Sequence, residues 1–433
     1  MCAWKTPKID SATFAMRRPL QLAPLFGFLA TATPTEPSQQ HPILGLDPVT
    51  ANTPPTISVD LFRSLERTSR IVDITYCVGT SGISRPFSCV SRCNEFPSFN
   101  LVTTWNTGVL LSDSCGYIAV DHGVRRPGDE DRFEGEVGDK AIIVAFRGTY
   151  SITNTVVDLS TIPQEYVPYP SPDDGDEEPP RVHRCQDCTV HMGFLASWRQ
   201  ARKLVLPELK RLREEYPDYP VHLVGHSLGG AVAMLAALEI KVSLGWDDVI
   251  ITTFGEPKVG NQGLCDYVDT VFGLDKEDEE ERNAMNRTYR RVTHAGDPVP
   301  LLPLTEWGYK PHAGEFYIAK SELSPSIEDV LVCRGDSDSR CITKGDGGLF
   351  ESTARDLIEE AGMGKEDGEE VETERSLRKR LPGFPTPLKL WQLFFAHRDY
   401  FWRLGLCVPG GDPANWGRDK YGGGHGGVAS DEL

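Results

Sequence analysis

Positive charge is scarce in this sequence. The 433 residues include 45 lysines and arginines against 63 aspartates and glutamates, which gives a formal net charge of -18. Proteins that bind the phosphates of nucleic acids or the headgroups of anionic membranes depend on clustered basic side chains. The deficit therefore argues against both functions, and any contact with lipid has to be apolar.

Long apolar runs are scarce as well. Residues 20–29 form one, but it is too short to span a bilayer, and no other segment approaches the roughly 20 apolar residues that a span requires. Basic residues precede this run and residues 30–32 (ATA) follow it, an order typical of a secretory signal peptide. We expect residues 1–32 to be a signal peptide, with an interior strand or helix as the alternative. Residues 33–56, rich in Pro, Thr, Ser and Gln, are expected to be a propeptide or linker.

Cysteine, in contrast, is frequent, with 11 in the chain. Cys2 lies in the expected signal peptide, which leaves an even number, and in a secreted chain this favours disulfides. The sequence suggests four pairs, three of them by close spacing and the last because it flanks the expected domain: Cys89/Cys93, Cys185/Cys188, Cys333/Cys341 and Cys77/Cys407. Zinc binding by the closely spaced pairs is the alternative. The partners of Cys115 and Cys265 stay open.

The most informative stretch is a serine bounded by glycines. Residues 221–224 (VHLV) are mostly apolar, Gly225-His226-Ser227-Leu228-Gly229 follows, and residues 231–240 are rich in Ala. This order predicts a strand, a tight turn and a helix, the pattern of a nucleophile elbow. Side chains larger than Gly would collide where the strand and the helix cross. The turn raises the Ser227 hydroxyl and directs the backbone N–H of Leu228 toward a developing oxyanion. A structural Gly-rich turn is the alternative.

Strand and helix patterns alternate along the chain. Apolar runs predict strands at residues 116–121, 141–146, 249–254 and 291–294. Helical spacing of apolar residues predicts helices at residues 59–76, from residue 194 to about 212, and at residues 260–271, whereas residues 89–105 are expected to be a loop. This alternation predicts an α/β fold of the α/β-hydrolase type, with a mostly parallel sheet covered by helices on both faces.

Two further positions lie at the carboxyl ends of predicted strands. Asp297 follows the strand that ends at His294, and Thr149 follows the strand at residues 141–146. Since parallel strands present their carboxyl ends at one edge, both residues should lie near Ser227. Asp297 could orient a histidine base, and Thr149 could offer its N–H and hydroxyl to an oxyanion.

The histidine base should follow Asp297 in the chain, because hydrolases of this architecture use the order Ser, Asp, His. Three histidines do so. His425 lies in a Gly-rich tail that cannot hold it, and His312 could be a packing residue. His397 lies among aromatic residues that can fix an imidazole and exclude water, so we favour it. His191, which precedes Ser227, is interpreted as structural, and His226 as packing under the elbow.

Five motifs in this order resemble those of the class 3 (filamentous-fungal type) lipases. They are residues 146–149 (FRGT), 190–194 (VHMGF), 225–229 (GHSLG), 294–300 (HAGDPVP) and 397–401 (HRDYF), and the resemblance covers residues 57–409. It implies a triad of Ser227, Asp297 and His397, oxyanion donors at Thr149 and Leu228, and an interfacial lid at about residues 151–160. Thr155 stands where the family's lid often carries Trp.

The implied activity is hydrolysis of the carboxylic ester bonds of acylglycerols through an acyl-enzyme, with no metal or organic cofactor. The substrate would be a lipid or another ester, bound at a lipid–water interface. An esterase acting on soluble or aryl (feruloyl-type) esters would share this site. A non-catalytic lipid-binding protein that retains the fold is the third possibility.

The rest of the chain adds two segments. Residues 345–380 form a charged insertion within the expected hydrolase domain at residues 57–409, and residues 410–433 form a Gly-rich tail. The tail ends in Ser430-Asp431-Glu432-Leu433, which resembles a signal for retrieval to the endoplasmic reticulum. We therefore expect a protein of the secretory pathway, either extracellular or retained in the lumen of the endoplasmic reticulum.

Overall fold

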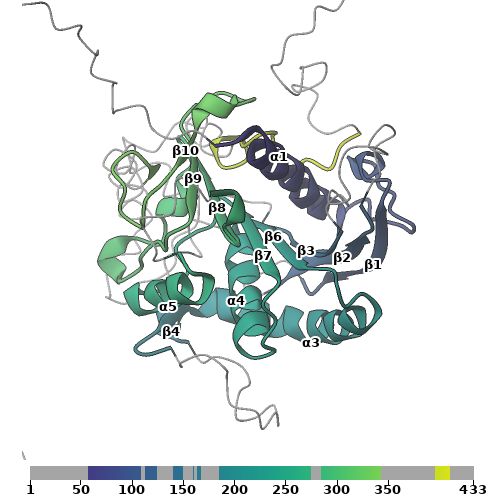
Figure 1. Cartoon of the computed structure of the whole chain (residues 1–433), viewed down its shortest axis with the longest axis horizontal. Helices are drawn as coiled ribbons and strands as arrows, with labels where there is room; N and C mark the ends of the chain where they lie inside the picture. Colours follow the sequence, from purple (N-terminus) through teal and green to yellow (C-terminus); the bar gives the residue numbers. More distant parts are fainter. Residues whose placement is uncertain are drawn as a thin grey trace, which may run out of the picture. The chain divides into compact units, whose positions relative to one another are not determined.

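A sheet of eight strands runs through the described part of the protein (Figure 1). This computed structural model describes residues 57–108, 113–123, 140–149, 159, 163–166, 185–274, 284–342 and 395–409. The expected signal peptide, the linker, the lid apart from Leu159, the charged insertion and the Gly-rich tail lie outside these residues. Those predictions are therefore not tested by the fold.

The strands of the sheet lie in the order β1-β2-β3-β6-β7-β8-β9-β10. Their bounds are Phe99–Asn106 (β1), Cys115–Asp121 (β2), Ala141–Phe146 (β3), Val221–His226 (β6), Val249–Phe254 (β7), Tyr289–His294 (β8), Glu315–Ile318 (β9) and Val330–Val332 (β10). From β3 to β9 each strand runs parallel to its neighbour, whereas β1 and β2 at one edge and β10 at the other pair antiparallel. The prediction of a mostly parallel sheet is confirmed. Pro163–Glu165 (β4) and Thr189–His191 (β5) form a separate antiparallel pair.

Helices connect and cover these strands. The α-helices are Val59–Ile74 (α1), Met192–Glu215 (α3), Leu228–Val242 (α4) and Gln262–Phe272 (α5). Short 3-10 turns lie at Thr75–Cys77 (η1), Cys93–Glu95 (η2), Ala284–Asn286 (η4), Val299–Leu301 (η5), Thr305–Trp307 (η6) and Ile327–Asp329 (η7). The Ser58 hydroxyl caps α1 by accepting the backbone N–H of Leu61, and the Asn261 side chain caps α5 in the same way. Of the helices in the described ranges, none is long and apolar enough to cross a membrane.

The two faces of the sheet carry different helices, as Figure 1 shows. Alternate side chains of a strand point to opposite faces. Ile142 and Val144 of β3 therefore pack into the cluster formed with α3, α4 and α5. Ile143 and Ala145 of the same strand pack on the other face, with α1 and with aromatic residues of the C-terminal segment 395–409. Both faces are buried, which is why a central strand such as β3 is a continuous apolar run.

The expectation of a loop at residues 89–105 is wrong in its second half, where β1 begins at Phe99. This strand lies at the edge of the sheet, so only some of its side chains are buried, and its pairing with β2 shifts register between Leu101 and Thr103. An edge strand with a bulge lacks both a continuous apolar run and a clean alternation. The sequence of β1 therefore showed neither of the two patterns by which strands are predicted.

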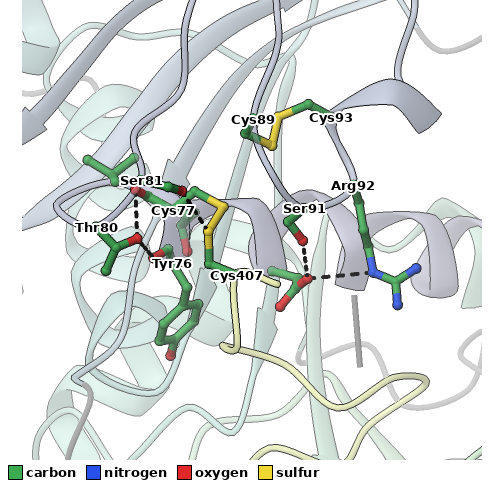
Figure 2. Close-up of a disulfide and its surroundings, with 12 residues drawn as sticks. Tyr76, Cys77, Thr80, Ser81, Cys89, Ser91, Arg92, Cys93 and Cys407 are labelled. Atoms are coloured by element: carbon green, nitrogen blue, oxygen red, sulfur yellow. Dashed lines mark hydrogen bonds and ion pairs between the residues drawn. A yellow bond between two sulfur atoms is a disulfide. The ribbon is translucent and has the colours of Figure 1, made fainter. Parts of the chain in front are cut away.

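The four predicted cysteine pairs are disulfides. They join Cys77 to Cys407, Cys89 to Cys93, Cys185 to Cys188 and Cys333 to Cys341. Figure 2 shows the first two. Cys115 and Cys265 are buried free thiols. The Cys77–Cys407 bond joins the start of the hydrolase fold to its last described segment.

Candidate active site

The turn between β6 and α4 brings Ser227 to its apex. Ser227 has φ 57° and ψ -130°, a backbone conformation that is strained for any residue with a side chain. A Cβ on Gly225 would lie 2.1 Å from the Gly229 carbonyl oxygen, and a Cβ on Gly229 would lie 2.4 Å from the carbonyl oxygen of Phe146. Only glycine fits at either position, because the helix crosses the strands at backbone contact distance. This is the geometry expected of a nucleophile elbow.

Asp297 and His397 are in direct contact. The Nδ1 atom of His397 lies 2.9 Å from Oδ1 and 3.0 Å from Oδ2 of Asp297, and both side chains are buried. The carboxylate also accepts the backbone N–H of Val299 and the hydroxyl of Tyr400. An ionised carboxylate is an acceptor only, so Nδ1 of His397 carries the proton and Nε2 is left as an acceptor.

Oγ of Ser227 and Nε2 of His397 are among the buried side-chain atoms that have no hydrogen-bond partner in the described residues. Buried polar atoms without partners are rare in proteins and frequent where a reacting group is held ready. The surroundings are tight, since a Cβ on Gly255 would lie 2.9 Å from Cε1 of His397 and 2.9 Å from Oδ2 of Asp297.

The segment that follows β3 lies against the elbow. A Cβ on Gly148 would lie 2.8 Å from Cβ of Ser227 and 2.7 Å from the His226 carbonyl oxygen. The half-buried Thr149 is the next residue in the chain, and its part as an oxyanion donor stays a prediction. Arg147 fixes the same segment by donating from Nη1 to the Val78 carbonyl at 2.7 Å. Leu228 is the first residue of α4, and N–H groups of a first helical turn have no partner within the helix.

Two other histidines that the sequence offered have hydrogen-bond partners outside this group. His312 is hydrogen-bonded through Nε2 to Oε1 of Glu256 at 3.0 Å, in a separate buried cluster. His191 caps α3 by accepting the backbone N–H of Gly193 at 3.1 Å, so its structural interpretation fits. His425 lies outside the described residues.

The sequence did not reveal the hydrogen bonds that Tyr76, Tyr400 and His226 make around the site. Tyr400 lies in the HRDYF motif, three residues after His397, so that motif was its signal. Tyr76 follows α1 and donates its hydroxyl to Nδ1 of His226, 150 residues away in the chain. No local sequence pattern predicts a contact between residues so far apart in the chain.

One group of metal-ligand atoms is present in the described ranges. Glu315, Cys333 and Cys341 place one such atom each within 4.8 Å of the others. The two sulfurs are joined in a disulfide, and the Glu315 carboxylate accepts hydrogen bonds from Arg291 and Thr293. These atoms are committed to other bonds.

Comparison with known proteins extends this picture. A sequence profile of the family described as Lipase (class 3) matches residues 143–307. Lipase A of Sodiomyces alcalophilus is 60% identical over 395 residues, which cover 91% of each chain. The secreted mono- and diacylglycerol lipase 2 of Gibberella zeae is 58% identical over 395 residues, 91% of this chain and 92% of that one. Among solved structures, Lip2 lipase of Yarrowia lipolytica is similar with a TM-score of 0.60 and 26% identity, over 82% of this chain and 98% of that one.

Proposed function

Because this chain belongs to the class 3 lipase family of α/β hydrolases, and is therefore a carboxylic ester hydrolase, we propose that Ser227, Asp297 and His397 are its catalytic triad. The observation that carries the proposal is the contact between Asp297 and His397 at the sheet edge where the strained turn presents Ser227. Residues 57–409 would then be the hydrolase domain.

The proposed reaction begins with proton transfer. His397 takes the Ser227 proton on Nε2 while its Nδ1–H stays bonded to Asp297, and Ser227 Oγ attacks the carbonyl carbon of the ester. The negative charge that develops on the carbonyl oxygen is stabilised by the N–H of Leu228 and by Thr149. The bond to the glycerol oxygen then breaks, and that oxygen leaves with the proton held on Nε2. Water attacks the acyl-enzyme by the same route and releases the fatty acid.

The substrate proposed is an acylglycerol. Two relatives that match 91% of this chain support this, because one is named a lipase and the other a mono- and diacylglycerol lipase. We expect partial acylglycerols at a lipid–water interface to be hydrolysed. The oxidising conditions that the disulfides require support the secretory pathway. The relative named a secreted mono- and diacylglycerol lipase supports release outside the cell. The C-terminal retrieval signal stays a prediction.

A substrate panel tests this proposal. Purified disulfide-intact protein is assayed on emulsified mono-, di- and triacylglycerol and on a short soluble ester, beside Ser227→Ala as the matched control. The proposal expects fatty acid release from an acylglycerol and a loss of at least about 1000-fold in Ser227→Ala. Activity confined to soluble aryl esters would overturn the substrate assignment, and an active Ser227→Ala would overturn the triad.

A further inference from the structure

His226, the residue before the proposed nucleophile, has a partner on both ring nitrogens. Its Nε2 lies 2.8 Å from the main-chain carbonyl oxygen of His397, and its Nδ1 lies 2.5 Å from the hydroxyl of Tyr76. A carbonyl oxygen can only accept a hydrogen bond, so Nε2 of His226 carries the hydrogen. Nδ1 then has a free lone pair and accepts the Tyr76 hydroxyl. The two partners together select one neutral tautomer.

The surroundings keep that tautomer uncharged. His226 is 1% exposed, and burial lowers its pKa well below the usual value, with the nearby His397 adding to the effect. The rings of His226 and His397 lie against each other, with centroids 4.6 Å apart and planes 32° from parallel. A second positive charge in this position would oppose the imidazolium that His397 forms during the reaction.

Tyr76 is itself held in place from outside the site. It belongs to η1, directly before Cys77, whose disulfide to Cys407 is drawn with Tyr76 in Figure 2. The guanidinium of Arg398, the residue after His397, lies over the Tyr76 ring at 5.4 Å from its centroid. The Tyr76 hydroxyl is therefore a hydrogen-bond donor in a fixed position, and its bond to Nδ1 orients the His226 ring.

His397 needs such support because of where it lies in the chain. It belongs to the segment 395–409, of which only two residues are helical and which contributes no strand to the sheet. The hydrogen bond to Asp297 fixes the position of Nδ1 of His397. A ring that is held at one atom can still change its orientation when the main chain of the residue moves. The bond from His226 fixes the main chain of the same residue.

We infer that His226 is a positioning residue, which holds the His397 main chain so that the imidazole faces Ser227 and Asp297 together, and that Tyr76 fixes the tautomer of His226 needed for this. The inference rests on the proposed triad. The hydrogen bonds of His226 go to the His397 main chain and to Tyr76, so His226 acts on the reaction through His397.

Three substitutions test it on the full, disulfide-intact chain with a soluble p-nitrophenyl ester. His226→Phe keeps a flat ring but has no donor, His226→Gln keeps a donor at the place of Nε2, and Tyr76→Phe removes only the hydroxyl. Because small misplacements of a catalytic group cost up to about 100-fold, His226→Phe should lower kcat by roughly 10- to 100-fold with KM unchanged within about 2-fold. His226→Gln should restore part of that loss, and Tyr76→Phe should lower kcat by roughly 3- to 10-fold.

His222→Gln is the matched control, because His222 lies on the same strand and bonds to Oγ1 of Thr252 at 3.0 Å, away from the site. It should lower the melting temperature and leave kcat unchanged. Wild-type kcat in folded His226→Phe would overturn the inference, and so would equal loss of kcat in His226→Phe and His222→Gln. If His226→Phe does not fold, Tyr76→Phe decides, and wild-type kcat there overturns the inference.

Ser227→Ala and His397→Ala are measured in the same assay. If they remain active, the proposed function fails. If they are inactive while the His226 and Tyr76 variants match the wild type, only the positioning inference fails.

Discussion

At the scale of single residues, Tyr400 is the group that most directly supports the carboxylate of Asp297. Its hydroxyl donates to Oδ2, the oxygen that also lies 3.0 Å from Nδ1 of His397. Burial raises the pKa of Tyr400 well above its usual value, and the neighbouring Asp297 raises it further. The Tyr400 hydroxyl therefore keeps its proton above the pH at which an ordinary tyrosine loses it, and as a donor it holds the carboxylate in one orientation.

Tyr400→Phe should consequently lower kcat by at least roughly 3- to 10-fold, because one hydrogen bond that orients the Asp297 carboxylate is lost. The measurement is steady-state hydrolysis of a soluble ester. Tyr289→Phe is the control, since Tyr289 is equally buried and donates to Oε2 of Glu256 at 2.8 Å, outside the site. Loss of kcat in both variants, or in neither, contradicts the role given to Tyr400.

The residues of the candidate triad could be predicted because each lies in a local pattern. Ser227 lies between two glycines after an apolar strand, and Asp297 follows another strand directly. The contact of Tyr76 with His226 could not be predicted, because it depends on how α1 packs across the sheet. Likewise, the sequence assigned His226 only to packing, since a single histidine gives no sign of what its two nitrogens contact.

At the scale of elements, the segment 395–409 is fastened to α1 at three points. The indole N–H of Trp402 donates to Oε1 of Glu66 at 2.7 Å, the backbone N–H of Gly405 donates to Oδ1 of Asp73 at 2.7 Å, and Cys407 is bonded to Cys77 directly after the helix. Asp73 is also paired with Arg92 and Ser91, which Figure 2 shows beside the two disulfides. This segment carries His397, so its attachment to α1 bears on the site.

Replacing Cys77 and Cys407 by Ser should lower the free energy of unfolding by about 2–5 kcal/mol, because the bond closes a loop of 330 residues in the unfolded chain. Urea denaturation measures this. The control is the double replacement of Cys89 and Cys93, which are only 4 residues apart and should cost less. An equal cost for both pairs would contradict the explanation of the Cys77–Cys407 stabilisation by loop length.

Elements were predictable where burial dictates composition. β3 is buried on both faces and is a continuous apolar run, and β6 and β7 are mostly buried and begin with apolar residues, so these strands follow from the sequence. β1 was not predictable, because an edge strand with a bulge has a mixed composition. The four disulfides followed from spacing and from an even count, although spacing alone cannot decide between a disulfide and a zinc site.

At the scale of the whole molecule, buried neutral histidines set the response to acid. Burial, together with the charges of Arg290 and Arg67, lowers the pKa of His222 to about 3. Burial also lowers the pKa of His226 and of His294. An unfolded histidine titrates near pH 6.5, so between about pH 6.5 and pH 3 the unfolded chain binds a proton that folded His222 does not.

The free energy of unfolding should therefore decrease as the pH falls from about 6.5 to about 3. Urea denaturation at a series of pH values measures the slope. His222→Gln should make this slope shallower over the same range, because Gln does not titrate. A slope that is equal in the variant and the wild type would contradict the assignment of His222 as a buried neutral group.

The central claim is that Ser227, Asp297 and His397 act together to make one hydroxyl nucleophilic. Labelling of the folded protein with a fluorophosphonate, followed by mass analysis of its peptides, tests this most directly. We expect rapid modification of Ser227 in the wild type, no modification of that peptide in Ser227→Ala, and labelling slowed by at least about 1000-fold in His397→Ala. A folded wild-type protein that is not labelled at Ser227, or a His397→Ala variant labelled at the wild-type rate, would contradict the account.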